Sequence, residues 1–490
     1  MSGNSFFYVI LAMFALGSGW IALASIYPMA FDEEFHLGLI KIYATSLLPY
    51  GIEHTSDMAQ FGSATADASY LFHYLMSFPY RLLAAFGLPD VASIIILRLL
   101  NIGFVVAALI VFKRALIEAK ISRIIANVAL LLVTLIPIFP FLAAHINYDN
   151  LLLLIFAWCI LCMVRITNIV RSGKPLPLGQ SVQLACAVLI GMSIKYAFLP
   201  FALGIFIWLV WLLVLGYRIH KQTISTQVAS LKRRWKSQGK NKRIAMACLI
   251  ILSLFFASHY ATNTLSYGSP IPSCERVFTE TECTAYGPWN RNKSMEARKS
   301  ESFQPMPYSV YMASEWMPGM TQRLLFAVAG KTNDFQTKLP LPVLVYLFLT
   351  LSGIGFVCLI VQAVRKRTSW FIAFTFLLAT IYCGVLSFQL YGDYVDTAEP
   401  VAINGRYLIP LLPLVAAVLI QAIAQTLRNI DRRIIAVVSV AILLLLIPAG
   451  AGIGTYVVQS EAHWFWPGSG QSSHTALQTV FNSFVFPARY

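Results

Sequence analysis

Apolar segments long enough to cross a membrane recur along the 490-residue chain and limit what it can fold into. A spanning segment is helical and needs about 20 apolar residues, because its backbone hydrogen bonds must be made within the segment. Only 12% of the residues are charged, whereas soluble domains carry about 25%. The pattern predicts an all-α, polytopic membrane protein with roughly eleven spans, near residues 7–28, 91–112, 123–143, 150–166, 180–195, 198–217, 243–260, 340–362, 370–388, 407–426 and 434–453.

The first apolar segment, FFYVILAMFALGSGWIALASIY, contains no charge and no small-residue cleavage site. It is therefore interpreted as a retained first span and not as a removed signal peptide. The fifth span is the shortest of the set, because Lys195 and Pro200 interrupt an otherwise continuous apolar region.

The net charge of +15 is explained by topology and not by nucleic-acid binding. Five connections on one side of the predicted spans hold 22 of the 36 Lys and Arg, and only Glu118 and Asp431 among the acids. Basic connections face the cytoplasm. The N-terminus is thus predicted inside and the C-terminus outside, and lipid headgroups suffice as the counter-charge of the basic stretch 231–243.

This topology divides the chain into four parts. They are an N-terminal membrane module (1–260) with an acidic first outer loop (31–90), a second outer loop (261–339), C-terminal spans (340–453) and an outer tail (454–490). The first loop carries short amphipathic helices in this interpretation. Cys274 and Cys283 lie in the second loop, nine residues apart in an oxidising compartment, so a local disulfide is predicted.

An acidic cluster, Asp32-Glu33-Glu34, follows the first span directly, with His36 two residues further on. One interpretation is a solvated helix N-terminus, where carboxylates complement the helix dipole. The other is a site, because a carboxylate beside the bilayer can take a proton from a hydroxyl or hold a divalent cation. The absence of a spacer after the span favours the second interpretation.

A second polar cluster interrupts the apolar third and fourth spans. His145, Asn147, Asp149 and Asn150 lie there, and ionisable groups at such a depth indicate function by default. The alternative is that Asn147 or Asp149 caps the fourth span. Capping by one residue leaves the others unexplained.

Two cations are predicted at the same outer boundary. Lys195, followed by Tyr196, breaks the fifth apolar region, and Arg406 opens the tenth span after Asn404 and before Tyr407. Each cation is suited to phosphate, and the arginine fork suits bidentate contact. Snorkelling to headgroups is the alternative for both. Arg406 also has nearby acids as candidate partners, namely Asp393, Asp396 and Glu399.

Taken together, these motifs resemble the GT-C superfamily of integral membrane glycosyltransferases, and in particular polyprenyl-phosphate-sugar-dependent protein mannosyltransferases and aminoarabinose transferases of bacteria. The motif Asp32-Glu33-Glu34-Phe35-His36-Leu37-Gly38 resembles the acidic motif of the family's first outer loop. The Asn147–Asn150 stretch resembles the polar position after the third span, and Asn404–Tyr407 resembles an arginine-tyrosine motif. The spacing of the acidic motif departs from the mannosyltransferase form, which leaves open whether Asp32 or Glu33 is the base.

The resemblance implies inverting transfer of a sugar from a polyprenyl phosphate to a hydroxyl of an envelope glycan, lipid or protein, on the outer face of a bacterial inner or plasma membrane. Asp32 would be the catalytic base, with Glu33 in reserve. Lys195, Arg406 and Tyr407 would bind the donor phosphate. Substrate-orienting roles are expected for Glu34, His36, His145, Asn147, Asp149, Asn150, Tyr196 and Asn404. No cofactor is expected to be required, because a lipid phosphate is a good leaving group, and a divalent cation stays open.

Two other functions compete with glycosyl transfer. A transporter or flippase of a lipid-linked glycan would place its charges near mid-membrane, on broken and repeated helices. A membrane scaffold gives no reason for carboxylates and cations to gather at one rim.

Overall fold

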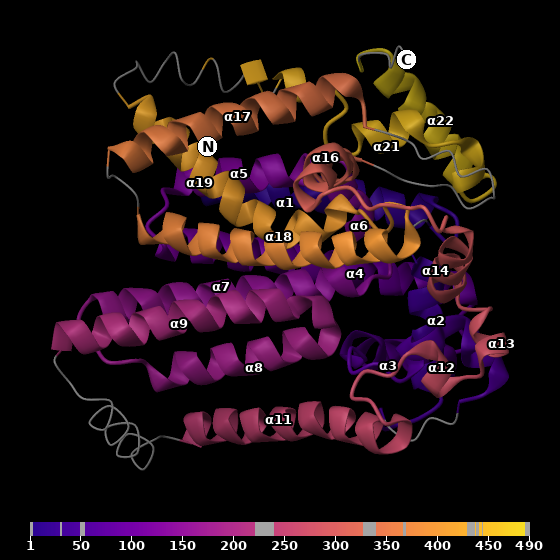
Figure 1. Ribbon diagram of the computed structural model, residues 1–490. Coiled ribbons are helices and arrows are strands. Elements are labelled where there is room, and N and C mark those ends of the chain that lie inside the picture. Colours follow the sequence, from indigo (N-terminus) through magenta and orange to yellow (C-terminus); the bar gives the residue numbers. More distant parts are fainter. Residues whose placement is uncertain are drawn as a thin grey trace.

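The structure is a computed structural model that describes residues 3–29, 32–49, 54–220, 240–326, 340–365, 369–428, 437, 441–442 and 444–485. These residues form helices and one isolated antiparallel bridge, between Ser25 and Phe465. The long helices run side by side as a bundle (Figure 1), and are α1 (Asn4–Ala24), α4 (Asp90–Glu118), α7 (Tyr148–Arg171), α9 (Leu199–His220), α11 (Lys240–Tyr267), α17 (Pro342–Val364), α18 (Trp370–Thr397) and α19 (Leu412–Thr426).

Eight helical segments of the described residues are long and apolar enough to cross a membrane, so the chain is a multi-pass membrane protein. The segments 123–134 and 178–194 are apolar but shorter. Part of the predicted span 434–453 lies outside the described residues, and its described end, 447–453, forms turns. The predicted span 123–143 is broken into α5 (Arg123–Thr134) and α6 (Ile138–Ala143). Pro137 stands at the break, where proline removes a backbone donor and interrupts a helix.

Short helices gather at one end of the bundle (Figure 1). The predicted first outer loop forms α2 (Glu33–Ala44), η1 (Ser56–Thr65) and α3 (Leu71–Ala85), and α2 packs along α3. The prediction of short helices in this loop is thereby confirmed. The remaining elements are α8 (Leu178–Ile194), η2 (Tyr196–Phe198), α14 (Gly287–Arg298), α15 (Tyr308–Tyr311), η3 (Met312–Trp316), α16 (Met317–Leu325), η4 (Gly405–Leu411), α21 (Gly454–Gln459), η5 (Ala462–Trp464) and α22 (Ser469–Asn482).

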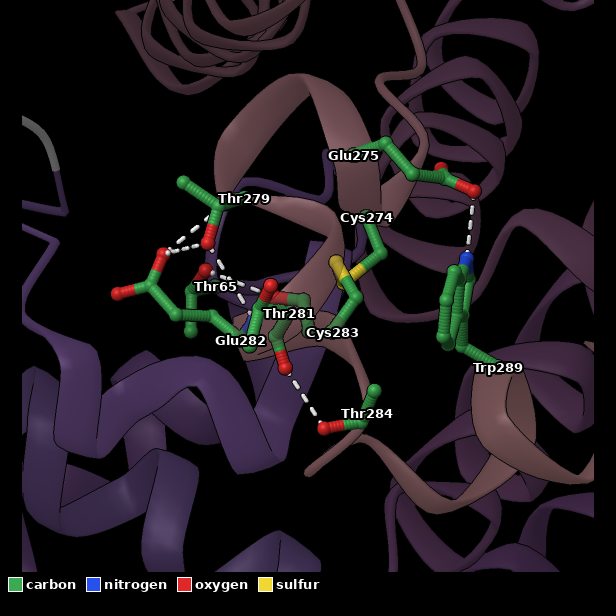
Figure 2. Close-up of a disulfide and its surroundings, with 10 residues drawn as sticks. Thr65, Cys274, Glu275, Thr279, Thr281, Glu282, Cys283, Thr284 and Trp289 are labelled. Atoms are coloured by element: carbon green, nitrogen blue, oxygen red, sulfur yellow. Dashed lines mark hydrogen bonds between the residues drawn. A yellow bond between two sulfur atoms is a disulfide. The ribbon is translucent and has the colours of Figure 1, made fainter.

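The predicted disulfide in the second outer loop is confirmed. Cys274 and Cys283 join α12 (Cys274–Val277) to α13 (Glu280–Cys283), as Figure 2 shows. Both cysteines are buried. Beside them, the Glu275 carboxylate accepts a hydrogen bond from Trp289 Nε1 at 2.5 Å. The pair of helices that carries the disulfide is hydrogen-bonded to the first loop. The Ser56 hydroxyl donates to the Glu282 carboxylate at 2.6 Å. The two outer loops therefore form one layer over this end of the bundle.

Candidate active site

Asp32 stands at the junction between α1 and α2, and it is exposed, as Glu34 of the same acidic cluster is. Its backbone is left-handed (φ 62°, ψ 18°), and its side chain is 59% exposed. Arg406 Nη2 lies 3.1 Å from Asp32 Oδ2, and the arginine side chain is only 7% exposed. Aspartate tolerates the left-handed region better than most residues, and holding it there requires contacts on both sides. A carboxylate that is both exposed and held by a buried cation can meet an incoming hydroxyl.

Glu33 is in a different environment from Asp32, although it is the next residue. It forms a bidentate pair with Arg98, with Nε to Oε1 at 2.8 Å and Nη2 to Oε2 at 2.7 Å, and both side chains are fully buried. Met29 N–H also donates to Glu33 Oε2 at 2.8 Å. Burial opposes the charged form, but the Arg98 charge and these hydrogen bonds hold the pKa of Glu33 below its usual value. A carboxylate bound in this way cannot reach a substrate, so we reassign Glu33 from reserve base to a positioning residue.

Arg98 is a residue of the candidate site that the sequence reasoning missed. Besides Glu33, it donates from Nη1 to the carbonyls of Ala22 (3.0 Å) and Ser25 (2.7 Å). It thus joins the last turn of α1 to the first turn of α2, and Asp32 lies between them. A lone arginine inside the apolar stretch SIIILRLLN is a signal that could have identified it, because a charge within a span is costly and therefore functional by default.

Lys195 and Asp149 form the second ion pair of the site. Lys195 Nζ lies 2.8 Å from Asp149 Oδ1, with side-chain exposures of 10% and 23%. The ammonium also lies over two aromatic faces, 4.3 Å from the ring centre of Tyr148 and 4.9 Å from that of Tyr407. Asp149 Oδ2 is buried without a hydrogen-bond partner. The pair therefore has unused acceptor capacity beside a desolvated cation.

A narrow pocket connects the two ion pairs. Its polar lining comes from α7, from the residue before η2, and from η4, and comprises Asp149, Asn150, Lys195, Arg406 and Tyr407. The open space is about 20 Å³, which is enough for roughly one water molecule. One cavity is thus shared by predicted site residues that are far apart in the sequence. They come from the second polar cluster and from both cation motifs. Asp32 contacts this group through Arg406.

The NGRY motif is built by close backbone packing. Asn404 Oδ1 accepts from Arg406 N at 3.1 Å and so caps η4. Gly405 lies against α16, where a Cβ would collide with the backbone of Met320 and Leu324. Asn404 therefore fixes the turn that presents Arg406, and its predicted contact with substrate stays a prediction.

The residues of the second polar cluster differ in what they contact. Asn147 is the N-cap of α7, and its side chain accepts from Asp149 N at 2.8 Å. Asn150 Nδ2 donates to the carbonyls of Leu142 (3.0 Å) and His145 (3.2 Å). Both asparagines hold the α6–α7 turn, as the capping interpretation predicts for one of them. Asp149 is the residue of this cluster that pairs with a cation.

The remaining predicted residues lie around this centre at different depths. His145 is fully buried, and its Nδ1 lies 2.6 Å from the Phe141 carbonyl. Glu34 is exposed, and Tyr196 is 53% exposed. Tyr286 of the second outer loop stacks on Phe35 at 6.3 Å between ring centres. Burial and then the charges of Asp67, Tyr196 and Asp32 raise the pKa of Tyr286 to about 12.

His36 pairs with His73, a residue that the sequence reasoning did not select. His36 Nδ1 lies 2.9 Å from His73 Nε2, both rings are buried, and His36 packs edge-on to Tyr148 at 4.5 Å. Burial lowers the pKa of His73 to about 3. Burial and then the charges of His73, Arg406 and Lys195 lower the pKa of His36 well below its usual range. Both imidazoles are therefore neutral near pH 7.

The His36–His73 pair makes stability depend on pH. Below about pH 6.5 an unfolded histidine binds a proton, whereas His73 with its pKa of about 3 does not. The contribution of His73 to stability is therefore full above about pH 6.5 and is lost as the pH falls towards 3, by about 2 kcal/mol at pH 5. We expect the wild type to melt at a lower temperature at pH 5 than at pH 7.5. The difference should shrink in His73→Gln, and an equal difference in both proteins would contradict this assignment.

Comparison with known proteins gives one family match and several similar folds. Residues 63–262 match the family model of dolichyl-phosphate-mannose-protein mannosyltransferases. Among curated proteins, none has a sequence that matches the chain. The solved structures include ArnT from Cupriavidus metallidurans bound to undecaprenyl phosphate, with 14% identity, a TM-score of 0.43, and coverage of 98% of this chain and 70% of that one. They also include the Archaeoglobus fulgidus oligosaccharyltransferase tethered with an acceptor peptide, with 11% identity, a TM-score of 0.44, and coverage of 99% and 60%.

The matched region begins inside η1 and ends inside α11, and it contains Arg98, Asp149 and Lys195. It agrees with the resemblance that the acidic, Asn-Asp and Asn-Gly-Arg-Tyr motifs indicate. The eight apolar helices agree with the same assignment. Residues 63–262 are thus similar to the dolichyl-phosphate-mannose-protein mannosyltransferases, in a chain with several helices long and apolar enough to cross a membrane.

Proposed function

We propose that the chain transfers a sugar, with inversion, from a polyprenyl-phosphate donor to a hydroxyl of a cell-envelope glycan, lipid or protein on the non-cytoplasmic face. One observation carries the proposal: two buried cations, Lys195 and Arg406, line one pocket at the rim, and Arg406 also holds the exposed carboxylate of Asp32. The donor phosphate and the base, Asp32, would thereby both lie within reach of the Arg406 side chain. The family match, to enzymes described by a dolichyl-phosphate donor, supports the donor class.

In this proposal the acceptor hydroxyl gives its proton to Asp32 while its oxygen forms a bond to the anomeric carbon. The bond between that carbon and the phosphate oxygen breaks, and the polyprenyl phosphate leaves with the electron pair. Lys195 and Arg406 stabilise the charge that develops on the phosphate. The pocket holds only about 20 Å³ of open space, so the donor phosphate must replace Asp149 and Asp32 as partner of these cations.

The polyprenyl tail is assigned to an apolar cavity of about 430 Å³ between α5, α16, α17 and α19. The run of chain from η4 into α19 lines the polar pocket with Arg406 to Pro410 and the apolar cavity with Leu412 to Ile423. Lipid is as apolar as these side chains, so the cavity would select the chain by van der Waals fit and not by the hydrophobic effect.

The three neighbouring carboxylates do not form a shared cation site. Asp32 faces Arg406, Glu33 faces Arg98, and Glu34 is exposed. Among the described residues no group of three or more His, Cys, Asp or Glu is arranged to hold a metal ion. The proposed mechanism assigns the leaving phosphate to Lys195 and Arg406, and a divalent cation stays open.

The proposal is tested with purified protein in nanodiscs and a panel of labelled polyprenyl-phosphate sugars, with envelope extract as acceptor. Release of polyprenyl phosphate together with a labelled product is expected for one donor. The flippase alternative is measured in proteoliposomes, from the accessibility of the same donor to an external reagent. Movement of donor across the bilayer without any labelled product would overturn the enzyme assignment.

Arg406→Ala is expected to weaken donor use more than acceptor use. Removal of one stabilising donor at a developing charge costs about 10²- to 10³-fold in kcat, and the effect on the donor KM should exceed that on the acceptor KM. Arg298→Ala is a matched control, since Arg298 pairs with Glu399 at 3.7 Å and is 68% exposed. Equal changes in both KM values for Arg406→Ala would count against the phosphate role.

A further inference from the structure

The C-terminal segment Gly454–Asn482 pairs directly with the end of α1 that leads to Asp32. Ser25 and Phe465 form an antiparallel bridge. Ile26 N–H donates to the Trp464 carbonyl at 2.8 Å, and Trp466 N–H donates to the Ala24 carbonyl at 2.9 Å. The segment therefore binds the backbone of α1 exactly where the helix stops.

Side chains reinforce this pairing. The hydroxyls of Tyr456 and Ser25 lie 2.7 Å apart and are buried. Trp20 Nε1 donates to Ser473 Oγ at 3.3 Å. Gly470 lies so close to α1 that a Cβ there would come within 2.7 Å of the Ala24 carbonyl oxygen. A side chain at position 470 would push the two segments apart.

These contacts are needed because α1 ends in apolar surroundings. The last carbonyls of a helix have no partner within the helix, and leaving them unpaired and buried is costly. At α1 the carbonyls of Ala22 and Ser25 receive donors from Arg98. The Ala24 carbonyl, which lies between them, receives the N–H of Trp466. The end of α1, at residues 22–26, is thus held by Arg98 on one side and by the C-terminal segment on the other.

We propose that the C-terminal segment is a positioning element for Asp32: it fixes the end of α1 so that the left-handed Asp32 is presented to the acceptor. This inference rests on the proposed function, in which Asp32 is the base. The two aromatic residues on either side of Phe465, Trp464 and Trp466, contribute through their backbone groups. These hydrogen bonds go to α1, so the proposed effect is on the base.

The test compares Trp466→Pro, which removes the N–H donor to Ala24, with Trp466→Phe, which keeps it. Gly470→Ala is a second variant that disturbs the pairing without proline. Thr479→Ala, on the exposed face of α22, is the matched control. In the full chain, hydrogen exchange of the amides in residues 22–36 and steady-state kinetics are measured for each protein.

We expect faster exchange of residues 22–36 in Trp466→Pro and Gly470→Ala. A displacement of about 1 Å at a reacting group costs on the order of 100-fold, so kcat should fall by about 10- to 100-fold with the donor KM unchanged. Trp466→Phe and Thr479→Ala should match the wild type. Folded Trp466→Pro and Gly470→Ala proteins with wild-type exchange in residues 22–36 and wild-type kcat would overturn the inference. Exchange does not depend on turnover, so a wild type without transferase activity would overturn the proposed function and leave the exchange result interpretable.

Discussion

Asp32→Asn is expected to abolish sugar transfer while the protein stays folded. Asparagine has nearly the same shape and also tolerates the left-handed backbone found here (φ 62°). Its amide oxygen can still accept from Arg406, which lies 3.1 Å from the native carboxylate. The substitution therefore removes mainly the ability to take a proton. Loss of a general base costs about 10²- to 10⁴-fold, which should appear in kcat with donor binding preserved.

The measurement is transfer from the labelled polyprenyl-phosphate sugar that the wild type uses, with thermal melting recorded in parallel. Asp90→Asn is the matched control. Asp90 is also an outer aspartate with a cationic partner, Lys41 at 3.4 Å, and its side chain is 73% exposed. It should retain wild-type activity, because an exposed pair of this kind contributes at most about 1 kcal/mol. Full activity in a folded Asp32→Asn protein would remove Asp32 from the role of base.

Arg98→Met is expected to have the largest effect on stability. It leaves Glu33 fully buried and without its cation, and removal of one partner of a buried pair costs about 3–5 kcal/mol. The carbonyls of Ala22 and Ser25 lose their donor as well. Melting of the purified protein in detergent should show a large decrease, and activity should be lost at temperatures where the wild type is stable.

The double variant Glu33→Gln/Arg98→Met separates charge from position. It removes the uncompensated charge, so we expect part of the stability to return, as is found when both members of a buried pair are neutralised. Activity should stay low, because nothing then joins the end of α1 to the start of α2. An Arg98→Met protein as stable and as active as the wild type would contradict the positioning role of this pair.

The acidic motif illustrates how far residue types alone predict a site. The sequence places Asp32, Glu33 and Glu34 at the end of the first span, and the charge distribution predicts an outer-rim position for them. It does not separate their roles. In the structure the first is exposed and bound to Arg406, the second is buried on Arg98, and the third is exposed. The choice between Asp32 and Glu33 depends on Arg98, which is distant in the sequence.

The polar clusters illustrate the same limit. A cap and a catalytic contact require the same residue types, so the sequence left both interpretations of Asn147 and Asp149 open. The structure makes Asn147 the N-cap of α7 and pairs Asp149 with Lys195 at 2.8 Å. His73 carried no pattern of its own, because a histidine in an amphipathic helix is identified only by the partner that it meets, here His36.

By itself, the sequence determined the membrane class, the helical architecture and the polar motifs, because the lengths of apolar segments and the placement of charge are local properties that a bilayer acts on directly. The disulfide could also be predicted from the sequence, since its cysteines are nine residues apart. Only the tertiary structure decided the pairings of Asp32 with Arg406, of Glu33 with Arg98 and of α1 with the C-terminal segment. Such contacts join residues far apart in the chain, and which buried charge meets which partner depends on how the helices pack.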